Sequence, residues 1–168
     1  ELVKVDYDRF EENFKNDLSI WQDDLPYYEL NGVGVEPSDN EGFKWIEASA
    51  KQGYIDAQVA LGDLYDYGIG VKEDKSEMKV WYTKAALRGS TNAMRNLAFH
   101  SYVYEKDFPK TIDLLKKVYN LGDYRVAYII GKRYENAGSK YRSLEEAYKW
   151  YKIAGDECNH VEALIKLG

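Results

Sequence analysis

The chain has 168 residues, of which 45% are hydrophobic and 31% charged, and its formal net charge is −6. These values are typical of a soluble globular domain. No apolar run approaches the roughly 20 residues that a membrane-spanning helix needs, so we expect no membrane insertion. The lone cysteine, Cys158, excludes an internal disulfide.

The charge is distributed unevenly along the chain. Residues 1–80 carry 8 basic and 19 acidic side chains, whereas residues 81–168 carry 15 basic and 10 acidic ones. Nucleic-acid-binding proteins need a dominant basic face, so we expect no nucleic-acid partner. The acidic half favours a protein partner with a basic or bipolar surface.

The sequence is compatible with two cellular compartments, the cytoplasm and the periplasm. The first ten residues lack the basic head and apolar body of a secretory signal. Because the chain begins at Glu1 rather than Met, removal of a signal remains an alternative, and we expect a soluble protein of the cytoplasm or the periplasm.

The first predicted elements are two helices. A degenerate leading helix covers residues 6–17, with Phe10 and Phe14 on its inner face. A second helix lies within residues 20–31, where Pro26 weakens or shortens it.

A sequence repeat begins in this second segment. Residues 25–45 align without a gap with residues 61–81, at a spacing of 36 residues. The alignment pairs Trp45 with Trp81 and brings two glycine loops into register: Gly32 and Gly34 with Gly68 and Gly70. A fixed period of this length predicts stacked supersecondary units, which usually form binding surfaces.

Each full unit is predicted to contain two helices. Residues 54–68 carry apolar side chains at three- and four-residue steps, which places them on one helical face. Gly62, beside this stripe, lets a neighbouring helix approach closely, and Gly68 suits the left-handed residue that closes a helix. Residues 74–89 form the second helix, which ends at Gly89.

Helix starts recur at matching positions of the repeat. An N-cap residue followed three positions later by glutamate is a capping box, which satisfies free backbone N–H groups. Three such pairs are present: Ser38 with Glu41, Asp74 with Glu77, and Ser143 with Glu146.

The later units are less regular. The unit at residues 91–122 lacks both loop glycines, and its second helix is predicted to begin near Asp107–Pro109. The pattern returns afterwards, and the chain ends in what reads as the start of another first helix. We therefore expect about ten helices in one domain, residues 1–168, with repeats at approximately 19–53, 54–89, 91–122 and 123–157 and a partial unit at 159–168.

These motifs resemble the Sel-1-like repeat, a relative of the tetratricopeptide repeat. The family pattern is, in outline, A-x3-L-G-x2-Y-x2-G-x-G-V followed by K-A-x2-W-Y-x-K-A-A-x2-G. The matching residues are Ala57, Leu61, Gly62, Tyr65, Gly68, Gly70, Val71, Trp81, Tyr82, Lys84, Ala85, Ala86 and Gly89. The resemblance implies an all-α, right-handed superhelical solenoid of antiparallel helix pairs. It also implies that the first helices line a concave face used in multiprotein complexes.

The sequence predicts neither a phosphate site nor a metal site. The Gly-x-Gly loops follow helices and recur with the repeat, so turn geometry explains them better than phosphate binding. Cys158 and His160 lack the additional, well-spaced ligands of a zinc site and the groups that would orient a nucleophile. We expect no metal and no cofactor.

For one carboxylate pair, both a catalytic role and a structural role are conceivable. Asp63 and Asp66 are three residues apart, so they share a helical face and form a conceivable acid–base pair. A solvated helix face explains them better. We expect no enzymatic activity and no catalytic residues, and we keep a hydrolase acting through this pair as the less favoured alternative.

The first helices also carry side chains that the apolar stripes leave outside. Tyr and Arg bury large, rigid areas at low entropic cost and are common at binding hot spots. We therefore predict a partner-binding concave groove formed by Tyr27, Asp63, Asp66, Arg95, Phe99, Tyr102, Tyr128 and Lys132.

The sequence thus predicts a non-enzymatic protein–protein interaction module that acts as an adaptor or scaffold. Two other roles remain open. One is a stand-alone inhibitor, such as a bacterial immunity protein that neutralises a cognate toxin. The other is a structural role through self-assembly at the final half-unit.

Overall fold

The computed structural model describes residues 39–167, which fold into α-helices, one π-helical turn and the loops between them, with no strand in this range. The described elements are α2 (Asp39–Lys51), α3 (Ile55–Tyr67), α4 (Lys75–Leu87), α5 (Thr91–His100), η2 (Ser101–Glu105), α6 (Phe108–Asn120), α7 (Val126–Asn136), α8 (Leu144–Cys158) and α9 (Val161–Leu167). The predicted helices at 6–17 and within 20–31 lie outside the described residues.

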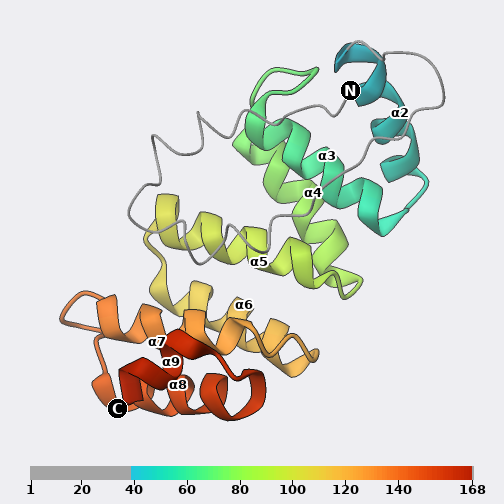
Figure 1. Ribbon diagram of the computed structural model, residues 1–168. Coiled ribbons are helices and arrows are strands. Elements are labelled where there is room, and N and C mark those ends of the chain that lie inside the picture. The colour runs from blue at the N-terminus through green and yellow to red at the C-terminus, as the bar shows by residue number, and fades with distance from the viewer. Residues whose placement is uncertain (1–38, 168) are drawn as a thin grey trace.

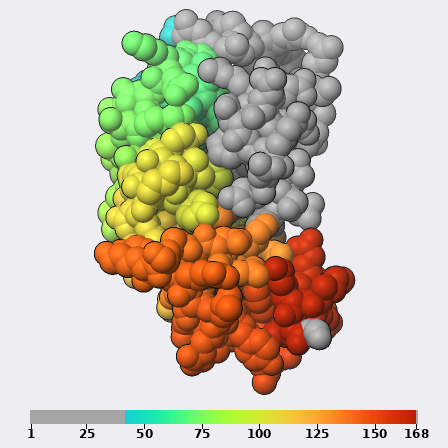
Figure 2. Space-filling view, turned by 90° about the vertical axis from the view of Figure 1, so that its left-hand side faces the viewer, coloured from blue at the N-terminus to red at the C-terminus, as the bar shows by residue number. Residues whose placement is uncertain are grey.

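Helices that follow one another in the sequence pack against one another in space. Every consecutive pair of helices from α2 to α9 is in contact. Within the described residues, the larger helix–helix contacts are all between such neighbours in the sequence. The helices therefore stack in chain order along one axis (Figure 1). In the space-filling view the green, yellow and orange parts follow one another in the same order, and the red end of the chain lies beside the orange part (Figure 2). This confirms the all-α repeat solenoid that the 36-residue period predicts.

Local sequence signals set the helix boundaries. Asp74 accepts hydrogen bonds from the backbone N–H groups of Ser76 and Glu77, and Ser143 accepts one from Glu146. Asp107 caps α6 in the same way, at the start predicted for that helix. Gly68 closes α3 with φ 68°, in the left-handed region, as predicted. Such caps satisfy backbone groups that the helix leaves free.

Two helix pairs, α3–α4 and α7–α8, share the same packing detail at equivalent positions. A Cβ atom on Gly62 would lie 2.5 Å from ring carbons of Tyr82, and one on Gly131 would lie 2.7 Å from Tyr151. The tyrosine rings therefore fill the space that the glycines leave open, as predicted for Gly62. Both rings are buried, within cores that contain Met78, Ala85, Ala147 and Ala154.

The loops of these two units also close alike. The backbone N–H of Asp74 donates to the carbonyl of Tyr65 over 2.9 Å, and that of Ser143 donates to the carbonyl of Tyr134 over 3.2 Å. Each loop is thereby tied back to the end of the first helix of its pair. This arrangement fixes where the second helix begins.

The irregular unit deviates where its glycines are missing. Here α5 continues directly into the π-helical turn η2, which ends at Lys106 with φ 55°. A lysine thus occupies the left-handed conformation that Gly68 adopts in the preceding unit. The Glu105 side chain braces the turn, because it accepts from Ser101 Oγ over 3.0 Å and pairs with Lys110 over 2.9 Å and Lys79 over 2.7 Å.

Candidate functional site

The predicted groove residues that the structure describes lie on α3, α5, η2 and α7, the first helices of their pairs and the turn that extends one of them. Tyr27 lies outside the described residues. The other seven are not simply arrayed on a surface. Several of them contact the next first helix along the stack.

Asp63 links α3 to both neighbouring helices. Its carboxylate accepts hydrogen bonds from the Tyr82 hydroxyl on α4 and from Asn96 Nδ2 on α5, the latter over 3.2 Å. Burial raises its pKa from 3.8 to about 7; the Tyr82 hydrogen bond opposes this shift and the charge of Asp66 adds to it. At neutral pH the group is therefore near the midpoint of its titration.

Asp66 has a different set of partners, at the end of α3. Its Oδ1 accepts from Lys75 Nζ over 2.8 Å, and the same ammonium donates to the Asp66 backbone carbonyl over 2.6 Å. Lys75 also pairs with Glu73 over 3.2 Å. Asp63 and Asp66 are thus each tied to their own partners, and their geometry points to structural bracing of the helix ends.

The α5–η2 segment contacts the loop before α7 and the last turn of α7. Arg95 pairs with Asp123 over 3.6 Å, and Asp123 also pairs with Arg125 over 2.9 Å. Further along, the Arg133 guanidinium carbon lies 3.7 Å from the centroid of the Tyr102 ring, a cation–π arrangement.

Tyr128 on α7 lies within a cluster of rings at the end of the stack. It stacks on His160 at a ring distance of 4.1 Å and tilts against Tyr151 at 5.5 Å. Burial raises its pKa to about 12, and a hydrogen bond with Glu162 adds to the shift. Its hydroxyl therefore remains protonated at any physiological pH.

The structure corrects the prediction for two of these residues. Arg95 is 5% exposed and Tyr128 is 6% exposed, so neither lies outside the packed part of the protein as its register suggested. The physical reason is that each meets a group of the following unit, Asp123 and His160 respectively. Phe99, Tyr102 and Lys132 are half-buried and keep part of their surface accessible.

Sequence reasoning missed two residues that shape this face. Arg133 is 1% exposed although it is an arginine, and Tyr102 covers its guanidinium. Glu105 joins α4, η2 and α6, and hydrogen bonds from Lys79 and Lys110 lower its pKa to about 2. No motif marks either position, because Arg133 meets Tyr102 of the preceding unit and Glu105 meets Lys79 of the preceding unit. Within residues 39–167, no cluster of three or more His, Cys, Asp or Glu side chains could hold a metal ion.

No helix in the described part of the chain is a candidate for membrane insertion. None of the helices between residues 39 and 167 combines the length and the apolar character needed to cross a bilayer.

Comparison with solved structures supports the same architecture. A Sel1 repeat protein from Oxalobacter formigenes superimposes with a TM-score of 0.67 and 25% identity, over 80% of this chain and 56% of that one. The c5321 protein, a protective antigen of uropathogenic Escherichia coli with an SLR fold, gives a TM-score of 0.65 and 25% identity, over 80% of this chain and 29% of that one.

Sequence relatives point in the same direction. The chitin synthase regulator SKT5 of Saccharomyces cerevisiae is 28% identical over 130 residues, which are 73% of this chain and 19% of that protein. The chain thus spans about a fifth of the length of this relative. The family model for the Sel1 repeat matches residues 24–54, 55–90 and 118–157, so most of the chain is covered. Sel1 repeats typically mediate contacts between proteins. The chain belongs to the Sel1 repeat family.

Proposed function

We propose that this domain binds a partner protein along the face formed by its first helices and so acts as an adaptor or scaffold within a larger assembly. One observation carries the proposal: side chains on this face connect successive first helices while Phe99, Tyr102 and Lys132 remain partly accessible. A surface held in this way changes little on binding, which lowers the entropic cost of association.

The connecting contacts run from one unit to the next. Asp63 accepts from Asn96, and Tyr102 stacks on Arg133. Arg95 and Asp123 form a third connection, between α5 and the loop before α7. In this proposal the buried side chains of Arg95 and Tyr128 hold the helices of the binding face in place. Asp63 and Asp66, on α3, form the acidic part of that face.

The regulatory role of a relative favours an adaptor over the other candidates. SKT5 is a regulator of chitin synthase by its name, and this chain resembles part of it. Nothing comparable favours an immunity protein. A hydrolase mechanism has little support, since Asp63 and Asp66 are already engaged by Tyr82 and Lys75.

The test compares two double variants that remove the same side chains from opposite helices of their pairs. Tyr102→Ala with Lys132→Ala strips the first-helix face, whereas Tyr148→Ala with Lys152→Ala strips exposed positions of α8. We expect the first variant to bind the partner captured from the native host at least about tenfold more weakly, as for hot-spot residues, and the control to bind normally.

Affinity capture with mass spectrometry identifies the partner, and calorimetry with the purified partner gives the dissociation constants. Circular dichroism establishes that both variants are folded. Equal losses in the two variants, or a loss in the α8 variant alone, would place the binding face elsewhere.

A further inference from the structure

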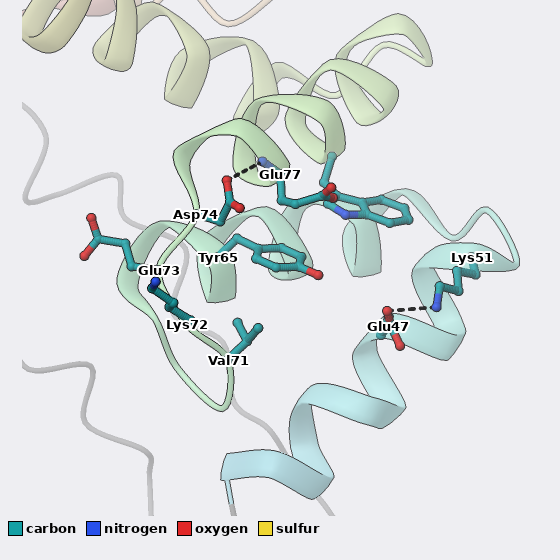
Figure 3. A pocket seen from close by; sticks show the side chains of 9 residues that line it. Glu47, Lys51, Tyr65, Val71, Lys72, Glu73, Asp74 and Glu77 are labelled. Carbon is teal, nitrogen blue, oxygen red and sulfur yellow. Dashed lines mark hydrogen bonds and ion pairs between the residues drawn. The ribbon is translucent and has the colours of Figure 1, made fainter.

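A pocket lies beside α2. It has a volume of about 540 Å³ and is enclosed by α2, the end of α3, the loop that follows and the first turns of α4 (Figure 3). Its lining residues are Glu47, Lys51, Tyr65, Val71, Lys72, Glu73, Asp74, Glu77 and Trp81. None of them belongs to the predicted groove.

The lining is acidic, and its carboxylates are engaged to different degrees. Asp74 caps α4, and Glu73 pairs with Lys75 and points away from Tyr65 in Figure 3. Glu47 pairs with Lys51 over 2.8 Å, but the Lys51 side chain is 60% exposed. Among the residues that the structure describes, Glu77 has no ion-pair partner. Glu47 and Glu77 are therefore the groups that an entering cation would meet.

The charges of these two carboxylates both affect the pKa of Tyr65. Burial raises the pKa of Tyr65, and the negative charges of Glu77 and Glu47 raise it further. The ring is held by an edge-on contact with Phe43, at a centroid distance of 5.7 Å. Tyr65 thus presents a fixed aromatic surface between two negative charges.

Trp81 contributes a second aromatic ring to the pocket lining. Its side chain lines the pocket and is 7% exposed, and its indole Nε1–H is buried and has no hydrogen-bond partner among residues 39–167. Lys84 Nζ lies 3.7 Å from the centroid of the indole ring, so this ring already takes part in a cation–π contact.

We propose that this pocket binds an arginine side chain of a partner protein, with the guanidinium against Tyr65 between Glu47 and Glu77. The proposal rests on the proposed protein-binding function and adds a second surface and the chemistry of its partner.

Several features favour an arginine-containing peptide. Carboxylates repel phosphate and carboxylate ligands. A guanidinium stacks on aromatic rings and forms paired hydrogen bonds with carboxylates, which a lysine ammonium does less well.

The indole resonance of Trp81 reports binding directly. We would titrate the ¹⁵N-labelled protein with the peptide acetyl-Gly-Arg-Gly-amide and, separately, with acetyl-Gly-Gln-Gly-amide, and follow the assigned indole N–H signals by NMR. We expect a saturable shift of the Trp81 signal with the arginine peptide only, while Trp45, which is 77% exposed, stays unchanged.

Charge-neutralising variants test the two carboxylates. Glu47→Gln and Glu77→Gln should each weaken the arginine peptide about threefold, the effect of removing one partly exposed ion pair. Glutamine at position 77 can still serve in the capping box of α4. Glu145→Gln on α8 makes the same charge change at a side chain that is 81% exposed, and it should leave the affinity unchanged.

Three results would overturn the proposal: no shift of the Trp81 signal, an equal shift with the glutamine peptide, or an equal weakening by Glu145→Gln. A failure here is distinguishable from a failure of the proposed function. The peptide titration does not involve Tyr102 or Lys132, whose variants test the first-helix face on its own.

Discussion

The carboxyl group of Asp63 makes the stability of this domain depend on pH in an unusual direction. Its pKa is raised to about 7 in the folded protein, chiefly by burial, against 3.8 as the ordinary value. Between these two values the folded state keeps a proton that the unfolded state has released. The contribution of Asp63 to the free energy of unfolding therefore falls as the pH rises from about 4 to about 7.

Asp63→Asn should remove this dependence, because the amide does not titrate and still offers an oxygen to Tyr82. A pKa difference of about three units at roughly 1.4 kcal/mol per unit predicts that the stability of the variant relative to the wild type increases by about 4 kcal/mol between about pH 4 and about pH 8. Urea unfolding of both proteins at the two pH values measures the change. A constant difference between the proteins would show that Asp63 titrates at its ordinary pKa.

Gly62 is a position where a single methyl group matters, since an added Cβ would lie 2.5 Å from the Tyr82 ring. Gly62→Ala should lower the free energy of unfolding by about 1–3 kcal/mol, as overpacking in a core usually does. Gly42→Ala on α2 is the matched control, because its Cβ would meet no heavy atom within 4 Å. That variant should gain about 0.5–1 kcal/mol from helix propensity.

Thermal or urea unfolding of the two variants distinguishes packing from propensity. If Gly62→Ala were as stable as Gly42→Ala, the close approach of α3 and α4 through this glycine would be contradicted.

The turn between η2 and α6 shows how one element adapts to a missing glycine. Lys106 adopts φ 55° and is exposed. A side chain in this region costs energy that glycine avoids, so Lys106→Gly should raise the free energy of unfolding by about 0.5–1 kcal/mol. Lys152→Gly, at an exposed position inside α8, should lower it by about 1 kcal/mol. Equal destabilisation by both substitutions would refute the argument.

At the scale of elements, the sequence was informative wherever a local rule applied. The cap residues Asp74 and Ser143 and the closing Gly68 were predicted from their own neighbours in the chain, because capping is a contact within a few residues. The π-helical turn η2 was not predicted, since no local signal distinguishes it from a continuing α-helix.

At the scale of the whole molecule, the period predicted the stack but not the contacts between units. Arg95 and Tyr128 were expected at the surface because helical periodicity identifies the inner face of one helix only. Their burial depends on Asp123 and His160, which belong to following units. The pocket beside α2 escaped prediction for the same reason, because the α3–α4 loop and α2 enclose it together.

The most direct test of the proposed binding face is site-specific photocrosslinking in the native host. Benzoylphenylalanine would replace Tyr102 on the first-helix face and, in a second protein, Tyr148 on α8, which is 55% exposed. The account predicts a covalent adduct with the captured partner from position 102 and none from position 148. An adduct from position 148 alone, or a partner that copurifies without crosslinking at position 102, would contradict it.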